Sequence, residues 1–440
     1  MVQNGEYWLL NKGDLAMLEV TLARLRRRWP AARIGVLTST PALLRALHPD
    51  VEAIVPGRLA RRTGNGPIGR IAARLSPSVV GPFSIGFISA REVPRMWTRR
   101  ALRYASKRFR DVTPHAVENA EPARACDSSR AERRALRGAD LLLAVGGGYL
   151  TDVDAEQAAR TFRFLEQAVI SGSPAALVGQ GFGPLRDERL REAAAAVLPR
   201  TTLIALREGR RGPSLLAELG VASDQVIVTG DDAIELATGA RRAEIGQDLG
   251  VCLRVAGYSP VATRAKAAVG SVVRTTATER GAALVPLIIS EYRSEDRRST
   301  LPLTTGFADV VPPLPRFAGP REVAARVSRC RVVVTGAYHL AVFALSQGIP
   351  VVGLTSSAYY DDKLLGLAEM FGDGLSIVRL DEPDLQSRLS SAVADAWEKA
   401  PALREPLRIR ADEQVARSRD AFEQVFAAVE RDLADPSILT

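Results

Sequence analysis

One segment of the chain, residues 331–354, restricts the fold more than any other. It begins with a β-branched run, Val332–Val334, and turns at Thr335–Gly336. A short apolar helix is predicted over Leu340–Gln347, where a glycine ends it, and a second apolar run covers Val351–Leu354. Two successive buried strands joined by a helix favour parallel pairing with a right-handed crossover. The segment therefore predicts an α/β fold.

His339 lies at the start of this predicted helix. The chain has three histidines, and the other two, His48 and His115, lie in Leu-His-Pro and Pro-His-Ala contexts that are typical of loops. Open α/β sheets bind ligands at the carboxyl ends of their strands, which is where His339 is predicted to lie. A functional role for His339 is therefore the hypothesis, and a packed structural histidine is the alternative.

The alternation of strands and helices extends over most of the chain. At 440 residues the chain is too long for one hydrophobic core. We predict residues 1–240 as one Rossmann-like domain, residues 248–383 as a second, a linker over 236–248 and a helical tail over 384–440. Predicted strands cover 33–37, 51–55, 140–145, 175–178, 203–206 and 226–228, and then 249–254, 283–289, 309–311, 332–334 and 351–354.

Composition narrows the class of protein. The net charge is +9, carried almost wholly by arginine, which suits an anionic substrate or an acidic membrane surface. No recognition motif accompanies these basic residues, so we expect no nucleic-acid partner. Cys126, Cys252 and Cys330 form no CxxC pair, which argues against a metal site and predicts a reducing cytoplasm. The longest apolar run outside predicted strands, Val79–Ala90, is far shorter than the ~20 residues of a spanning helix.

An Arg-rich insertion is predicted over residues 58–110. Its aromatic residues Trp97, Tyr104 and Phe109 are interleaved with arginines. One interpretation is a solvated helical insertion. The other is a surface that rests on anionic lipid at the inner face of the membrane or contacts a charged acceptor.

A set of motifs occurs along the chain in a fixed order. It comprises Asn11-x-Gly-Asp14, Gly146–Gly148, Gly179–Pro184, Arg207-Glu208 with Ser214, Gly230–Ala233, Arg254, Pro286 with Asp296, His339 followed by Gly348–Leu354, and Lys363. This ordered set resembles the polysaccharide pyruvyl transferases. The resemblance implies two Rossmann-like domains facing across a cleft, as in GT-B glycosyltransferases. It also implies transfer of a carboxyvinyl-derived group from phosphoenolpyruvate, as co-substrate and with no other cofactor, to sugar hydroxyls as a pyruvate ketal.

The resemblance also implies roles for particular residues. Ketal formation from an enol ether needs a general acid, and His339 is the candidate. A nearby carboxylate would keep it protonated, and Asp231, Asp232 and Glu291 are candidates, the first two being predicted as catalytic. The predicted donor-binding residues are Arg254, Lys363, Gly336 and Tyr338. The predicted acceptor-binding residues are Asn11, Asp14, Gly147, Gly148 and Gln180.

Structural alternatives accompany several of these roles. Arg254 could form a structural ion pair, and Lys363 could be a solvated loop residue. Asp14, directly before Leu15, could cap a helix. Gly146–Gly148 and Gly179–Gly183 could serve tight strand-to-helix turns.

The chain departs from the family pattern at two places. Ala337 occupies the position where the family usually has an arginine thought to bind the donor's anionic groups, and Tyr338 replaces a usual aliphatic residue. Only Met1–Leu10 precede Asn11, so the strand expected there is short or starts upstream. Two alternatives therefore stay open, a GT-B glycosyltransferase using a nucleotide-activated sugar and a binding-only member. A glycan or glycolipid is the expected acceptor, and its identity, its linkage and the oligomeric state stay open.

Overall fold

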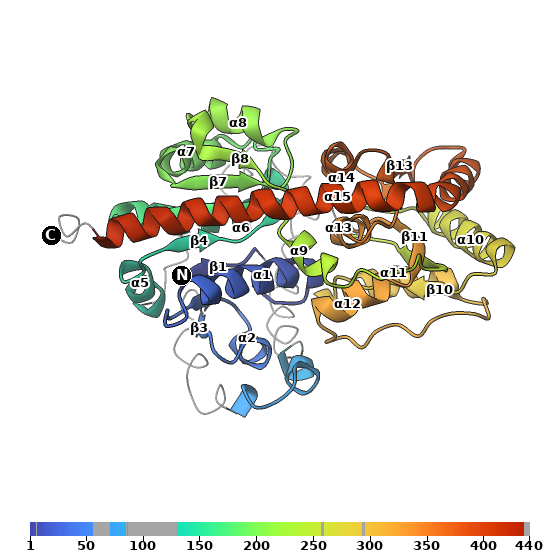
Figure 1. Cartoon of the computed structure of the whole chain (residues 1–440), viewed down its shortest axis with the longest axis horizontal. Coiled ribbons are helices and arrows are strands. Elements are labelled where there is room, and N and C mark those ends of the chain that lie inside the picture. The colour runs from blue at the N-terminus through green and yellow to red at the C-terminus, as the bar shows by residue number, and fades with distance from the viewer. Residues whose placement is uncertain are drawn as a thin grey trace, which may run out of the picture. The chain divides into compact units, whose positions relative to one another are not determined.

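The computed structural model describes residues 1–5, 7–55, 71–84, 86, 130–256, 259–292 and 295–434. The chain forms two compact units, one of Met1–Ile34 with Leu136–Thr440, and one of Gly35–Ala135. Figure 1 labels their helices and strands.

The smaller unit contains a short βαβ element. Strands β2 (Gly35–Leu37) and β3 (Glu52–Ile54) pair in parallel, with α2 (Pro41–Leu47) between them. Pro41 is well placed at the first turn of α2, because the N–H that proline lacks has no intrahelical partner there. These elements confirm the prediction for this stretch. Of the Arg-rich insertion, residues 71–84 and 86 are described. Trp97, Tyr104 and Phe109 lie outside the described residues.

The first sheet of the larger unit is parallel and buried. Its strands run in the order β1 (Val2–Gln3), β4 (Leu142–Ala144), β6 (Ala175–Phe182), β7 (Leu203–Leu206) and β8 (Val226–Val228), and β5 (Gly147–Leu150) also pairs with β6. Its helices are α1 (Lys12–Arg28), α6 (Ala155–Ser171), α7 (Glu188–Val197), α8 (Gly212–Glu218) and α9 (Ala233–Thr238), with α5 (Arg130–Arg137) preceding β4. All eight residues of β6 are buried, as expected for a central strand covered on both faces.

The second sheet is also parallel. Its order is β10 (Leu284–Pro286), β9 (Asp248–Cys252), β11 (Cys330–Thr335), β12 (Val351–Thr355) and β13 (Leu375–Arg379). The helices are α10 (Thr263–Arg280), α11 (Glu295–Thr300), α12 (Pro320–Val327), α13 (Tyr338–Ser346) and α14 (Ala358–Phe371). One apolar core joins this sheet to α10 and to the start of the last helix. The α/β class with two Rossmann-like halves is confirmed.

One predicted strand of this second half was wrong. Residues 309–311 form only an isolated bridge, between Val310 and Leu284, and no strand. The physical reason lies in the next two residues, Pro312 and Pro313, because proline has no N–H to continue a ladder. The fifth strand is instead β13, which pairs with β12 over its whole length.

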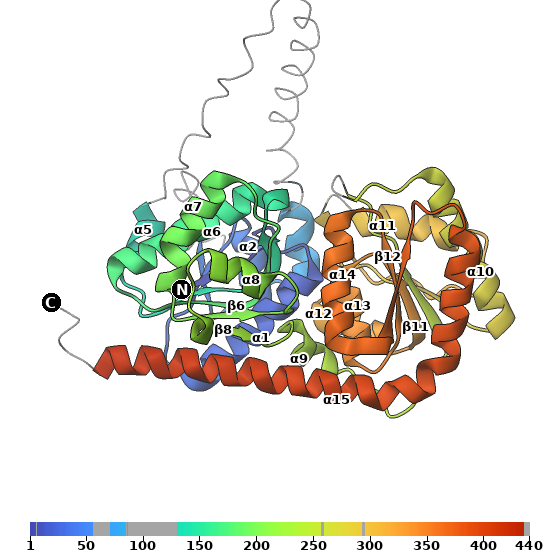
Figure 2. The ribbon, with the colours of Figure 1, turned by 90° about the horizontal axis from the view of Figure 1, so that it is seen from above.

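The segment predicted as a tail forms one long helix, α15 (Leu385–Ala434). It first covers the second sheet and then runs beside the first sheet, as Figures 1 and 2 show. Its buried residues recur at helical spacing along one face, among them Leu407, Val415, Phe422 and Phe426. The helix therefore ties the two sheets together. None of the described helices is both long and apolar enough to cross a membrane.

Candidate functional site

His339 occupies the predicted strand-to-helix turn. Strand β11 ends at Thr335, and α13 starts at Tyr338, two residues earlier than predicted. The Thr335 hydroxyl accepts a hydrogen bond from the backbone N–H of Ala337 at 2.9 Å and so closes the turn. His339 is thus fixed in the first turn of α13, at the carboxyl end of a central strand.

Asp231 connects His339 to Arg207. The Oδ2 atom of Asp231 lies 3.6 Å from His339 Nε2 and 3.7 Å from Arg207 Nη1. Its other oxygen accepts the backbone N–H of Ala233 at 2.9 Å. The Arg207 guanidinium also stacks 4.0 Å from the ring centre of Tyr338. Residues from both sheets therefore meet at one carboxylate.

Electrostatics favours the ionised form of Asp231. Burial alone raises the pKa of an aspartate, but the contact with His339 and the positive charge of Arg207 outweigh burial here and hold the pKa of Asp231 below its usual value. The negative charge of Asp231 therefore faces the imidazole of His339. Of the three carboxylates considered as partners of His339, Asp231 contacts it, whereas Asp232 pairs with Arg24 and Glu291 pairs with Arg297 in the described structure.

Several polar atoms around this carboxylate have no partner. Arg207 Nε, Asp231 Oδ2, Tyr338 Oη and His339 Nε2 are buried without a hydrogen bond within the described part of the chain. Buried polar groups in folded proteins are nearly always bonded, so such a cluster is typical of a site that takes up a polar ligand.

The Asn11-x-Gly-Asp14 motif brings α1 against His339. Asn11, not Asp14, caps the helix, because its side chain accepts the N–H of Gly13 at 3.0 Å. The capping role considered for Asp14 was therefore wrong. A Cβ atom on Gly13 would lie 2.0 Å from His339 Cγ and Nδ1, so only glycine leaves room for the imidazole. Asp14 lies in the buried first turn of α1. Burial raises the pKa of Asp14, the negative charge of Asp231 adds to this shift, and the charge of His339 opposes it.

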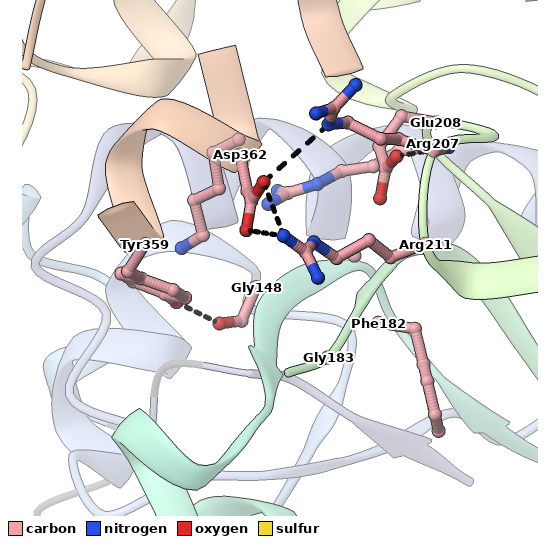
Figure 3. A pocket seen from close by; sticks show the side chains of 11 residues that line it. Gly148, Phe182, Gly183, Arg207, Glu208, Arg211, Tyr359 and Asp362 are labelled. Atoms are coloured by element: carbon pink, nitrogen blue, oxygen red, sulfur yellow. Dashed lines mark hydrogen bonds and ion pairs between the residues drawn. The ribbon is translucent and has the colours of Figure 1, made fainter. Parts of the chain in front are cut away.

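A pocket of about 400 Å³ adjoins this cluster. The residues that line it come from the ends of β5, β6 and β7 in the first sheet and from α14 in the second. Figure 3 shows Tyr359 donating from its hydroxyl to the backbone oxygen of Gly148, at 2.7 Å, and Asp362 paired with Arg211. Arg207 lines the pocket and also contacts Asp231, so it connects the pocket to the His339 cluster.

Two cations meet at one glycine of this pocket. A Cβ atom on Gly148 would lie 2.6 Å from Lys363 Nζ and 2.7 Å from Arg207 Nη2. Removal from water and then the charge of Arg207 lower the pKa of Lys363 well below its usual value. A bound anion between Lys363 and Arg207 would relieve this repulsion, so the arrangement suits a carboxylate or phosphate.

The glycine-rich segments are strands rather than turns into helices. Gly147 and Gly148 belong to β5, and Gly179–Phe182 continue β6 beyond the predicted end at Val178. Gly179 and Gly183 have positive φ, so the flexibility of glycine is needed there, but within and at the end of the strand. Gln180 is fully buried, and its amide donates to the oxygens of Ala144, Val145 and Tyr149.

Other predicted residues have contacts of their own outside the Asp231 cluster. Arg254 forms a bidentate ion pair with buried Asp296, at 2.6 and 3.0 Å. A structural ion pair was the alternative considered for this arginine. Glu291 pairs with Arg297, and the N–H of Gly336 donates to Cys252. Asp232 accepts a hydrogen bond from Ser418 on α15. Among the described residues, no three or more His, Cys, Asp or Glu side chains are grouped so that they could hold a metal ion.

Sequence reasoning missed the roles of Gly13 and Arg207. Arg207 follows the strand Leu203–Leu206 directly, and this position at a strand's carboxyl end was the available signal. Gly13 lies between two residues that were considered, but its role depends on a contact with a residue 326 positions away. Tyr359 and Asp362 carried no signal, because nothing local predicts which residues of a helix face a pocket.

The model of one protein family, polysaccharide pyruvyl transferase, matches residues 11–357. The chain belongs to this family. The match covers the whole cluster around Asp231 and ends before Lys363 and α15. Among curated proteins, none matches the chain.

Solved structures support the fold of this pyruvyl transferase family member. The UDP-GlcNAc 2-epimerase from Neisseria meningitidis, bound to UDP-GlcNAc, is 12% identical with a TM-score of 0.51, over 97% of this chain and 98% of that one. Another UDP-N-acetylglucosamine 2-epimerase is 15% identical with a TM-score of 0.51, over 96% and 94%. The glycosyltransferase of kitacinnamycin is 12% identical with a TM-score of 0.49, over 98% and 97%. The two epimerase structures, whose TM-scores exceed 0.5, show the GT-B-like fold with two Rossmann-like halves.

Proposed function

We propose that this transferase moves a pyruvyl group from phosphoenolpyruvate to a pair of hydroxyls on a glycan or glycosylated acceptor. The observation that carries the proposal is His339 paired with ionised Asp231 beside a pocket where Arg207 and Lys363 converge. A small donor with two anionic groups, a carboxylate and a phosphate, suits such a pair of cations. A protonated imidazole within reach of the donor is what ketal formation requires.

Arg207 and Lys363 offer a substitute for the family arginine that is missing at Ala337. Ala337 is buried and lies just before Tyr338, on whose ring Arg207 is stacked. The guanidinium of Arg207 therefore lies close to the helix start where the family arginine would begin. We assign the donor's anionic groups to Arg207 and Lys363, with the predicted contact from Arg254 reduced by its pairing with Asp296.

The chemistry follows from these positions. His339 gives its proton to the methylene carbon of phosphoenolpyruvate, which becomes a methyl group, and positive charge develops at the neighbouring carbon. One acceptor hydroxyl adds to that carbon and loses its proton. The bond between that carbon and the phosphate oxygen then breaks and phosphate leaves with the electron pair. The second hydroxyl adds to the same carbon and gives its proton to the now neutral His339, which closes the ketal. Asp231 stabilises the imidazolium before the transfer. We assign the acceptance of the first hydroxyl's proton to Asp14, which lies in the buried first turn of α1 near His339.

Thermal-shift and calorimetric titrations test the donor. Phosphoenolpyruvate should stabilise the wild type, because a ligand that binds only the native state raises its stability. Lys363→Gln should weaken that binding by roughly 1.5–3 kcal/mol, the scale for bonds to charged groups. Lys399→Gln is the matched control, since Lys399 is exposed and pairs with Asp395 on its own helix.

Each outcome separates the candidate functions. Stabilisation by UDP-GlcNAc without stabilisation by phosphoenolpyruvate would favour a nucleotide-sugar transferase. Binding of phosphoenolpyruvate without turnover on any glycan would favour a binding-only member. His339→Ala should keep phosphoenolpyruvate affinity and lose transfer, which distinguishes the general acid from a donor contact.

A further inference from the structure

A second pocket lies at the edge where the strands of the second sheet begin, opposite the edge that carries His339. Its volume is about 290 Å³, part of it open to solvent. It is bounded by residues 242–246 before β9, by the start of β11, by the end of α13 and by α15, which packs against α13 (Figure 2). Pockets for drug-sized ligands range from about 300 to 1,000 Å³, so this one suits a small ligand.

Four arginines give this pocket an excess of positive charge. They are Arg242, Arg331, Arg404 and Arg408, and one residue among the described lining, Glu244, is acidic. Arg408 lies 3.4 Å from Glu405, whereas the other three arginines form no ion pair within the described part of the chain. Burial and then the charge of Arg408 lower the pKa of Arg404. An anion in the pocket would therefore find positive charge that no carboxylate has neutralised.

Three of these guanidinium groups are held in place by backbone carbonyl oxygens. The acceptors are Trp397 for Arg331, Gln347 for Arg408 and Ala243 for Arg404, at 3.0, 3.1 and 2.9 Å. Arginine has five N–H donors, so each group keeps donors that these bonds do not use. Capping of the last carbonyls of α13 accounts for the bond of Arg408. It does not account for Arg331 and Arg404, whose bonds lead to other segments.

A buried acceptor without a partner also belongs to the lining. Gln347 directly follows the last residue of α13 and is 3% exposed. Its Nε2 donates to the carbonyl oxygen of Ala324 at 3.0 Å, which fixes the orientation of the amide, because a carbonyl oxygen only accepts. The Oε1 atom of Gln347 is then buried with no hydrogen bond within the described residues. Buried acceptors are nearly always bonded, so this one calls for an O–H or N–H donor.

We propose that this pocket binds inorganic phosphate, at a site separate from the anion site of Arg207 and Lys363. The arginines donate charge-assisted hydrogen bonds to the phosphate oxygens. At neutral pH inorganic phosphate keeps at least one O–H, which donates to Gln347 Oε1. Sulfate has a similar size and charge but no proton at this pH, so it would place an unprotonated oxygen against that acceptor. The site thus selects an anion that also carries a donor.

Calorimetric titration with inorganic phosphate tests the arginines, in the full chain carrying Lys363→Gln. This background removes one cation of the other anion site, so that phosphate binding reports on the pocket at Gln347. Arg404→Gln in the same background should weaken phosphate binding at least about tenfold, because a hydrogen bond to a charged group is lost. Arg417→Gln is the matched control, since Arg417 is exposed on the same helix and does not line the pocket.

Sulfate tests the role of Gln347 without a further substitution. Phosphate should bind the Lys363→Gln protein at least about tenfold more tightly than sulfate, because sulfate leaves the buried acceptor without a donor. Gln347→Met in the same background should remove this preference, with thermal melting as the check on folding. Equal affinity for the two anions would overturn the proposal. So would the absence of phosphate binding by the Lys363→Gln protein, or equal phosphate affinity with and without Arg404→Gln.

Discussion

The loop after β8 presents two neighbouring carboxylates to opposite surroundings. Asp231 faces His339 and Arg207, and its pKa lies below the usual value. Asp232 faces away, toward α1 and α15, where it accepts the Ser418 hydroxyl and lies 3.5 Å from Arg24. Burial raises the pKa of Asp232 to about 6, against the opposing charge of Arg24.

The difference shows how one loop serves both the site and the fold. Ser418 bridges the two groups, donating to Asp232 and accepting from Arg24 at 2.8 Å. Gly230, with a φ of 95°, packs so closely on Gln414 of α15 that a Cβ atom would lie 2.5 Å from the Gln414 amide oxygen. Helix α15 thus packs against the side of the loop that carries Asp232, while Asp231 faces His339. We expect Asp231 to control turnover and the contacts of Asp232 with α15 to control stability.

The largest effect should come from exchanging the two carboxylates for amides. Asp231→Asn removes the charge that stabilises the His339 imidazolium, so kcat should fall by about 10²–10⁴, the range for general-acid catalysis. Asp232→Asn should change kcat by less than about tenfold, because the side chain does not face the site. Steady-state kinetics with phosphoenolpyruvate and a glycan acceptor measures both. Similar losses of kcat in the two variants would contradict the comparison.

The next effect concerns the room that α1 leaves for His339. In Gly13→Ala the new methyl would lie 2.0 Å from the imidazole, so the ring must move away from Asp231. We expect kcat to fall by about 10²-fold, since small misplacements of a catalytic group are costly. Gly239→Ala is the control, because its nearest neighbour would be 3.4 Å away and its φ is negative. If a folded Gly13→Ala variant kept full activity, α1 would not determine the position of the His339 imidazole.

At the contact between Asp232 and α15, Ser418→Ala should lower the free energy of unfolding and leave kcat nearly unchanged. The change leaves Asp232 and Arg24 without their shared bridge, and a buried polar group without a partner costs about 1–3 kcal/mol. Urea unfolding measures the loss, with kcat expected to stay within about threefold of wild type. Ser390→Ala, at an exposed position on the same helix, is the matched control. If the free energy of unfolding were unchanged and kcat fell strongly, Ser418 and Asp232 would belong to the catalytic site and not to the stabilising contact with α15.

Local sequence patterns predicted most elements of this protein but not their contacts. Strands 203–206 and 226–228 were predicted with their observed bounds, because apolar periodicity and turn residues are local signals. Asp231 and Asp232 are equivalent by such signals. Their separation depends on α15, nearly two hundred residues later, which no local pattern connects to the loop.

The glycine-rich segments illustrate the same limit. Gly146–Gly148 and Gly179–Gly183 were predicted as tight turns, since glycine and turns are correlated. In the structure the glycines lie in or beside paired strands, and Arg207 lies so close to Gly148 and Gly181 that a Cβ atom on either would clash with it. A close approach between residues distant in the chain also requires glycine, and the sequence alone does not distinguish the two causes.

The smallest expected effect is a pH dependence of stability that resides in Asp232. Its folded pKa of about 6 lies above the ordinary value of 3.8, so the folded state binds this proton more tightly than the unfolded state. The resulting stabilisation is fully present below pH 3.8 and is lost as pH rises through 6. Between pH 5 and 7 the loss should be about 1 kcal/mol.

Asp232→Asn isolates this contribution, because asparagine stays neutral throughout. Urea unfolding of wild type and variant at pH 5, 6 and 7 should show their difference in unfolding free energy shifting toward the variant by about 1 kcal/mol as pH rises. Asp224→Asn, at an exposed position, should run parallel to the wild type. Parallel curves for Asp232→Asn as well would mean that Arg24 and Ser418 keep Asp232 ionised, and the two carboxylates of the loop would then differ in neighbours but not in charge.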